Sequence, residues 1–527
     1  MMQFAALVIS AVLFKLLGGQ YFTPLSVVLA GVIFFLRYGV DARLRQALEI
    51  FLLQFGALIY ALANQEPSYY EHAAMIFCLA PALHRLREMA RLAMAEGTVT
   101  LVFAYIVWSL VWSANTEMTL AGIYMSALCL VFLLAYVVTC GGDLHQIFRN
   151  VWQLLAAVLM GSIVVGGMGY GSTGQTFTGV TLHRNQFGFL LGLLILLGLF
   201  FLRARFRWLH LAGVAVGAVF LIYIDSKSSM ISIALTSVLW FVLTAKRWRI
   251  YAALAALAIA AFVVSLPSPK MDHFAMRMGR DPTFTSRTEI WADSVKLLAE
   301  QPYTGFGYNS VWSAFENRLA QYRDAPGPKY GHAHNAWIEW GLQLGGGGLL
   351  AYMLFLGVLL GRALALARQP ERFAAGVQVA CLLVYIQVYD LANVSTIPIT
   401  RFGFFMLAVA SLCLSFGSVT YRSEQERTPA VALGKPAGAH LGSAWRLLIG
   451  TLLVLVVFVG VATFAVWEDG RRFAAVNEPY PPAADAVAAS SYLEVDKFQW
   501  KSADKLHEYV RAHRQALVDK MNRSKAP

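Results

Sequence analysis

Long apolar runs separated by short polar stretches fill most of the chain. A bilayer core about 30 Å thick needs about 20 apolar residues per helix, and the runs approach that size at 3–17, 22–37, 46–63, 73–84, 98–113, 117–139, 151–169, 186–202, 208–225, 229–245, 250–268, 336–360, 374–390, 402–418 and 447–467. Several are short enough to be half-spans or interfacial helices. The pattern predicts an all-α, polytopic integral membrane protein with about 12 to 15 transmembrane helices.

Two longer polar segments stand apart from the apolar runs. Within 269–333, the sequence Ser286-Arg287-Thr288-Glu289 fits a helix-capping box, and apolar residues follow it at helical spacing up to Gln301-Pro302, which ends the helix. A second amphipathic helix is expected over about 310–322. The last segment, 468–527, is polar and ends in a helix-like pattern. We therefore divide the chain into N-terminal membrane helices over 1–268, a helical loop over 269–333, C-terminal membrane helices over 334–467 and a polar tail over 468–527.

Charge supports this assignment and orients it. Hydrophobic residues make up 58% of the chain and charged residues 14%, against about 25% charged in soluble domains. The net charge of +12 comes from small clusters in every second loop, such as Arg85, Arg87 and Arg91. Cytoplasmic loops carry such clusters, so 269–333 and the tail are expected on the outer face. Arg184 and Arg401 are basic exceptions there, and no nucleic-acid partner is indicated.

Two histidines provide the strongest local signal for chemistry. His332 and His334 lie in Gly331-His332-Ala333-His334-Asn335, directly before an apolar run. A loop histidine at the mouth of a helix, with an ordinary pKa of about 6.5, can take a proton from a sugar hydroxyl. Alternatively, one histidine caps the helix and the other is solvated. A zinc site is a third possibility, but two ligands without a nearby cysteine or third histidine are too few, so we predict no metal.

Three basic residues on the outer side form the second signal. Arg287 falls in the first turn of the capped helix, where the helix dipole favours an anion, and a guanidinium suits a diphosphate. Arg184 lies at the outer end of a helix, and Lys227 lies between two apolar runs. Each has a simpler explanation: Arg184 can snorkel, Lys227 can pair with Asp225, and Arg287 can be a solvated helix charge. Asp390, at an outer helix end, can orient a base or a sugar or make a structural hydrogen bond.

These residues resemble the signatures of the O-antigen ligase and polymerase superfamily of bacterial membrane glycosyltransferases. His334-Asn335 followed by residues 336–344 and then Gly345 to Gly348 is similar to the ligase hallmark. Three further blocks resemble family motifs in character and order: HRNQFG at 183–188, Ser226-Lys227-Ser228, and an Arg-x-x-x-Trp with a Pro-x-x-Gly-x-Gly at 287–291 and 302–307.

The resemblance implies transfer of a glycan from undecaprenyl diphosphate to an acceptor at the periplasmic face of the inner membrane. The reaction would be inverting, with no metal and no cofactor. His334 and Arg287 would be catalytic, and Arg184 and Lys227 would bind the diphosphate together with Arg287. His332, Asn335 and Asp390 would support them. The acceptor would be a lipid-linked glycan or lipid A-core.

Several readings stay open. Many ligases have arginine where this chain has Lys227, and the Ser-Lys-Ser form is closer to exopolysaccharide polymerases. A protein O-oligosaccharyltransferase belongs to the same superfamily. A polysaccharide or lipid-linked glycan transporter is the alternative from another class, but it normally has broken helices and a midplane site, whereas the polar signals here gather in one outer loop and the adjoining helix ends. The sugar, linkage and oligomeric state are not defined.

Overall fold

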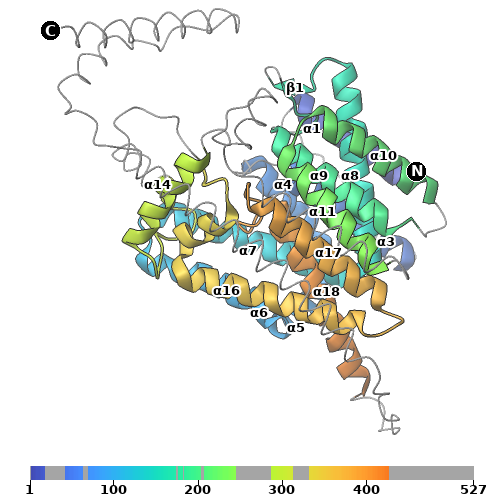
Figure 1. Cartoon of the computed structure of the whole chain (residues 1–527). Helices are drawn as coiled ribbons and strands as arrows, with labels where there is room; N and C mark the ends of the chain where they lie inside the picture. Colours follow the sequence, from blue (N-terminus) through green and yellow to red (C-terminus); the bar gives the residue numbers. More distant parts are fainter. Residues whose placement is uncertain are drawn as a thin grey trace, which may run out of the picture. The chain divides into compact units, whose positions relative to one another are not determined.

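The computed structural model describes residues 2–17, 42–62, 69–173, 176–181, 183–202, 207–244, 287–312 and 331–425 (Figure 1). The helices expected at 22–37, 250–268 and 447–467, the capping-box residue Ser286 and the tail 468–527 lie outside these residues. Residues 1–467 and 468–527 belong to separate compact units, so the fold described below is that of the first unit.

The described part is helical and membrane-spanning, which confirms the predicted fold class. Five helices are long and apolar enough to cross a membrane, α3 (Ala42–Leu62), α7 (Thr116–Thr139), α8 (Leu144–Gly167), α16 (Ala336–Ala367) and α17 (Phe373–Asp390). Shorter apolar stretches lie in α1 (Met2–Leu17), α9 (Arg184–Phe200), α10 (Arg207–Tyr223), α11 (Lys227–Thr244) and α18 (Phe402–Gln425). The total of about 12 to 15 spans stays a prediction, since three expected spans are outside the described residues.

A sharply bent helix pair corrects one sequence-based expectation. The chain runs through α4 (Tyr69–Leu79), the 3₁₀ helix η2 (Ala80–Arg85) and α5 (Leu86–Ala95), then bends by 89° into α6 (Gly97–Trp108) and the 3₁₀ helix η3 (Ser109–Trp112). The segment carrying Arg87 and Arg91 was expected to be a loop, and it is helical. Its periodicity explains this, because Met89 and Leu92 are buried while both arginines are exposed.

A buried ion pair holds the corner of this bend. Glu96, between α5 and α6, is completely buried, and its carboxylate accepts hydrogen bonds from Arg362 of α16 and Ser415 of α18. Thr98 Oγ1 donates to the other carboxylate oxygen at 2.6 Å. Charged groups inside a membrane protein require such partners. These hydrogen bonds attach α16 and α18 to the corner between α5 and α6.

The helix directions separate two ends of the described part. α16 packs against α17 and α6, and α9 packs against α8, α10 and α11 (Figure 1). Tyr389, at the end of α17, donates from its hydroxyl to the carbonyl of Asn185, at the start of α9, at 3.0 Å. The two helices are therefore antiparallel, and the basic turn at Arg368 and Arg372 lies at the end opposite to these contacts.

The polar segment 269–333 contains the amphipathic helix that the sequence predicted. α14 (Arg287–Glu300) ends before Gln301-Pro302 and buries Ile290 and Leu297. Of the second expected helix, 310–322, only the first residues are described. Two short strands lie between α8 and α9, β1 (Ser172–Thr173) and β2 (Thr176–Phe177). They pair antiparallel, with Ser172 opposite Phe177.

α16 is broken at Gly345, and the break is filled by residues 302–307. Gly345 has φ 62° and ψ −166°, which is outside the helical region. Four main-chain hydrogen bonds join the two segments: Phe306 N to Leu342 O and Gly307 N to Gln343 O, both at 2.9 Å, Gly346 N to Pro302 O at 2.7 Å, and Gly347 N to Tyr303 O at 3.2 Å. The loop thereby pairs backbone groups that the break takes out of the helix.

Close backbone approach requires glycine on both sides of this junction. A Cβ added to Gly345 would lie 2.3 Å from the carbonyl carbon of Tyr303. One added to Gly305, which has φ 63°, would lie 2.5 Å from the nitrogen of Gly345. The Pro-x-x-Gly-x-Gly block and the Gly-x-x-Gly block are therefore the two halves of one contact.

We expect Gly345→Ala to destabilise the protein. Its backbone lies in a region that only glycine adopts readily, at a cost of about 1–3 kcal/mol for another residue, and the added methyl group would also meet Tyr303. Gly357→Ala is the matched control, because it lies in the same helix and an added Cβ has no neighbour within 4 Å. Thermal unfolding in detergent measures both, and equal unfolding temperatures would contradict the proposed role of the junction.

Candidate functional site

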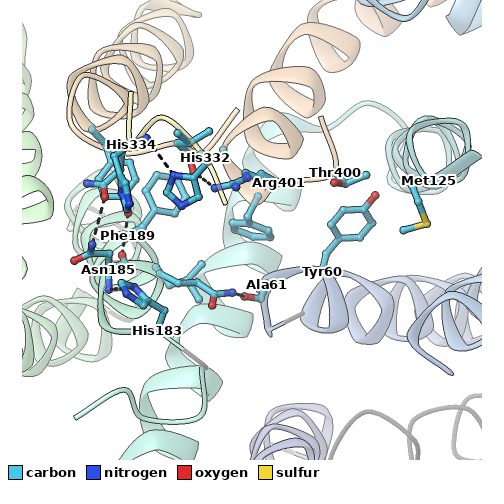
Figure 2. A pocket seen from close by; sticks show the side chains of 18 of the residues that line it. Tyr60, Ala61, Met125, His183, Asn185, Phe189, His332, His334, Thr400 and Arg401 are labelled. Carbon is cyan, nitrogen blue, oxygen red and sulfur yellow. Dashed lines mark hydrogen bonds between the residues drawn. The ribbon is translucent and has the colours of Figure 1, made fainter. Parts of the chain in front are cut away.

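A cavity of about 250 Å³ lies where the predicted motifs meet (Figure 2). One part of its wall is polar and comes from His183, Asn185, His332, His334, Asn393, Ser395 and Arg401; another part is apolar and includes Tyr60, Met75, Met125 and Phe189. No aspartate or glutamate is among the described residues that line it. A cavity with a guanidinium and hydrogen-bonding groups but no carboxylate suits an anionic or hydroxyl-rich ligand.

His334 is held at the cavity by the N-terminus of α16. It has a positive φ of 53°, and the next residue, Asn335, is the N-cap: its Oδ1 accepts from the N–H groups of Trp337 and Ile338 at 3.0 and 3.2 Å. The Nδ2 of Asn335 donates to the carbonyl of Leu391 at 3.0 Å. Asn335 therefore fixes both the start of the helix and the connection that follows α17.

The two histidines of the motif differ in their hydrogen bonding. The backbone N–H of His334 donates to Nδ1 of His332 at 3.1 Å, and the ring centroids are 4.0 Å apart. His332 is therefore bonded within its own loop. The alternative that one histidine caps the helix and the other is solvated is wrong, because Asn335 is the N-cap and neither histidine is exposed. The Nδ1 of His334 is buried and has no hydrogen-bond partner among the described residues. This buried ring nitrogen can pair with a ligand.

The surroundings keep the His334 imidazole neutral. Burial lowers its pKa to about 4, and the positive charges of Arg287, His183 and Arg401 act in the same direction. Burial, followed by Arg401, also lowers the pKa of His332 well below its ordinary value. At neutral pH His334 is therefore an unprotonated imidazole that can accept a proton.

The buried carboxylate of Glu339 fixes the loop that carries His332 and His334. Glu339 Oε2 accepts from the N–H of Ala333, between the two histidines, at 2.7 Å. Its Oε1 accepts from Trp312 Nε1 and Gln343 Nε2, each at 2.7 Å. On the other side, Trp291 of α14 donates to the carbonyl of Ala333 at 2.9 Å. Both main-chain polar groups of Ala333 are thus paired, and the loop is fixed between α14 and α16.

The predicted cations take different positions. Arg287 Nη1 donates to the carbonyl of Ala392 at 2.6 Å, so this residue reaches the connection beside the cavity although it is not one of the lining residues. Arg184 is the first residue of α9, after the N-cap His183. Lys227 Nζ lies 2.5 Å from Asp225 Oδ1, the simpler pairing that the sequence left open. Neither Arg184 nor Lys227 is among the described lining residues.

Asp390 has a structural environment. It is buried and accepts from the N–H of Ser395 at 2.7 Å and from Thr396 Oγ1 at 2.6 Å. These bonds shape the connection between α17 and α18. Among the described residues no group of three or more His, Cys, Asp or Glu side chains is arranged to hold a metal ion. The catalytic and binding roles assigned from the sequence stay predictions.

The sequence analysis did not select His183 or Arg401, which both line the cavity. His183 was visible only as a letter of the HRNQFG block, and its Nδ1 accepts from the N–H of Asn185 at 3.1 Å. Arg401 was noted only as a basic exception on the outer side, and it donates from Nη1 to the carbonyl of Val394. Its Nε is buried without a hydrogen-bond partner among the described residues. Its unusual place in a loop poor in basic residues was the available signal.

Comparison with known proteins supports the same assignment. The family model described as O-Antigen ligase matches residues 218–353, which include α11, α14, His334 and the break at Gly345. The exopolysaccharide production protein ExoQ of Rhizobium meliloti (strain 1021) is 26% identical over 297 residues, covering 51% of this chain and 67% of that protein. Together with the motifs and the multi-pass helical fold, these matches support a relationship to the O-antigen ligase and polymerase superfamily of membrane proteins.

Proposed function

We propose that the chain is a membrane glycosyltransferase that moves a glycan from undecaprenyl diphosphate to a hydroxyl of an acceptor glycan. The site faces the periplasm, and transfer uses neither a metal nor a cofactor. One observation carries the proposal: a neutral His334 with an unpartnered ring nitrogen lines a cavity that Arg401 also lines and that Arg287 lies beside. The relative named for exopolysaccharide production and the Ser226-Lys227-Ser228 block favour a polysaccharide polymerase over an O-antigen ligase.

In the proposed reaction, His334 accepts the proton of the acceptor hydroxyl. The acceptor oxygen attacks the anomeric carbon of the donor sugar and forms the new glycosidic bond. The bond between that carbon and the diphosphate oxygen breaks, and undecaprenyl diphosphate leaves with the electron pair. Attack opposite to the leaving group inverts the anomeric configuration. The proton then passes from His334 to water or to the diphosphate.

The arginines have two roles in this reaction. Their charges stabilise the negative charge that develops on the leaving diphosphate. In the empty site Arg287 and Arg401 also lower the pKa of His334. A bound diphosphate offsets their charge, so donor binding raises the pKa of His334 and makes it a stronger base. The base is therefore strengthened when the donor is in place.

The broken helix does not favour the transporter alternative. Broken helices are typical of transporters, where the unwound backbone lines the substrate site. In this chain the break at Gly345 is filled by residues 302–307 through main-chain hydrogen bonds, and Gly345 is not among the described cavity-lining residues. Its backbone groups serve the internal junction.

Cysteine labelling tests the proposed orientation. Lys296 of α14 and Gln369, in the turn between α16 and α17, are both exposed, while the native cysteines are all buried. We expect Lys296→Cys to react with a membrane-impermeant maleimide in intact spheroplasts and Gln369→Cys to react only after lysis. The reverse pattern would place the site in the cytoplasm and remove the proposed reaction.

Substitution of the base tests the reaction. We expect His334→Ala to lower glycan transfer by about 10²- to 10⁴-fold, the usual effect of losing a general base, while the protein stays folded. His84→Ala is the control, because His84 is exposed and is not among the cavity-lining residues. The assay uses lipid-linked glycan purified from cells that lack this chain, in detergent with EDTA. Full activity of His334→Ala would refute the base, and an EDTA loss reversed by a divalent ion would refute metal independence.

The low pKa of His334 predicts its chemical reactivity. Diethyl pyrocarbonate modifies neutral imidazole, and at pH 5 a group with a pKa of about 4 is about nine-tenths neutral, whereas an ordinary histidine is a few per cent neutral. We expect His334 to be modified at pH 5 much faster than a histidine peptide in the same sample. Arg287→Gln removes a like charge, so the midpoint should move to higher pH. Peptide mass spectrometry against pH gives the midpoint; a wild-type value near 6.5 would contradict the assignment.

A further inference from the structure

The connection between α17 and α18, residues 391–401, contacts the predicted motifs through its backbone. Its carbonyl groups at Leu391 and Ala392 accept hydrogen bonds from Asn335 and Arg287. Within the connection, Arg401 donates to the carbonyl of Val394. Asp390 holds its middle through Ser395 and Thr396. The connection is therefore a fixed part of the cavity wall, positioned by residues from three separate segments.

Two side chains of this connection have polar atoms without partners. Asn393 and Ser395 are 4% and 5% exposed, and both line the cavity. Asn393 Oδ1 accepts from Asn185 Nδ2 at 3.4 Å, but Asn393 Nδ2 and Ser395 Oγ have no hydrogen-bond partner among the described residues. Buried polar atoms are nearly always hydrogen-bonded, so two such atoms at one cavity indicate a ligand that pairs with them.

The chemistry of these atoms indicates a ligand rich in oxygen. The amide of Asn393 offers N–H donors, the hydroxyl of Ser395 can donate or accept, and the unpartnered Nε of Arg401 is a further donor at the same cavity. Sugar hydroxyls match this set because each both donates and accepts. A site built to bond a substrate hydroxyl strongly rejects an analogue that lacks it.

We propose that Asn393 and Ser395 bind hydroxyls of the donor sugar attached to the diphosphate and so determine which sugar is transferred. This inference rests on the proposed function. The donor is favoured over the acceptor by the sequence of the connection: Asn393 lies between Ala392 and Val394, whose carbonyls are held by Arg287 and Arg401. The sugar bonded directly to a diphosphate must lie beside the groups that bind that diphosphate.

A second serine provides a matched control. Ser294 of α14 is completely buried, and its Oγ also has no hydrogen-bond partner among the described residues. Ser294 is not among the described residues that line the cavity. Ser294→Ala and Ser395→Ala therefore remove the same atom from equally buried positions, and only the second removes it from the cavity.

Direct binding to two probes separates sugar recognition from diphosphate recognition. The purified full chain is titrated with undecaprenyl diphosphate and with the undecaprenyl-diphosphate-linked glycan extracted from cells that lack this chain. We expect Ser395→Ala to weaken binding of the glycan-linked lipid by about threefold to tenfold, the effect of losing one hydrogen bond, and to leave binding of undecaprenyl diphosphate unchanged. Ser294→Ala should change neither.

Asn393→Leu gives a second test with a side chain of similar size and no added charge. It removes the donor N–H₂ group together with the oxygen that accepts from Asn185. We expect it to weaken binding of the glycan-linked lipid more than binding of undecaprenyl diphosphate.

Each other outcome overturns a defined claim. Equal weakening of both probes by Ser395→Ala would assign the residue to the diphosphate and refute sugar recognition. Equal effects of Ser395→Ala and Ser294→Ala would refute a contact with the ligand. If Ser395→Ala left binding of the glycan-linked lipid unchanged and raised the KM for the acceptor, the assignment of Ser395 to the donor sugar would be refuted. Failure of the wild-type chain to bind either probe would refute the proposed function itself.

Discussion

The rest of the site depends on how the backbone of α16 is paired at its break. A helix in a membrane cannot leave N–H and C=O groups unpaired, and Gly345 interrupts the helix ten residues after Asn335. The segment 302–307 supplies the missing partners by main-chain hydrogen bonds. The contact that pairs the backbone groups at the break therefore also attaches residues 302–307 to α16. The short first half of α16 then holds His334 in a fixed position.

Charge is divided between the cavity and the structure behind it. The carboxylates nearest to the site, Glu339 and Asp390, are buried and use their oxygens to hold the histidine loop and the α17–α18 connection. The cavity itself is lined by histidines and Arg401, with no carboxylate among the described lining residues. This division keeps the wall rigid and leaves the cavity positive, which favours a neutral His334 and a diphosphate ligand.

Local sequence pattern predicted much of the fold because membrane helices are set by short-range apolar composition. Twelve of the expected apolar runs are helical in the described part, and α14 begins at Arg287 and ends before Pro302 as expected. The prediction is wrong where a helix carries charge. Arg87 and Arg91 indicate a cytoplasmic loop, whereas the structure places both residues in the helix α5. Met89 and Leu92 stand at helical spacing in the sequence, and the structure buries them while both arginines stay exposed.

The sequence by itself determined that the chain is a helical membrane protein and that His334 stands at the start of a helix, because apolar run length and motif spacing are local properties. It also marked Gly305 and Gly345, but their contact across forty residues was decided by the tertiary structure. The tertiary structure likewise placed His183, Asn393 and Arg401 at one cavity. Such meetings depend on helix packing, because the participating residues lie far apart along the chain and no local pattern encodes the distance between them.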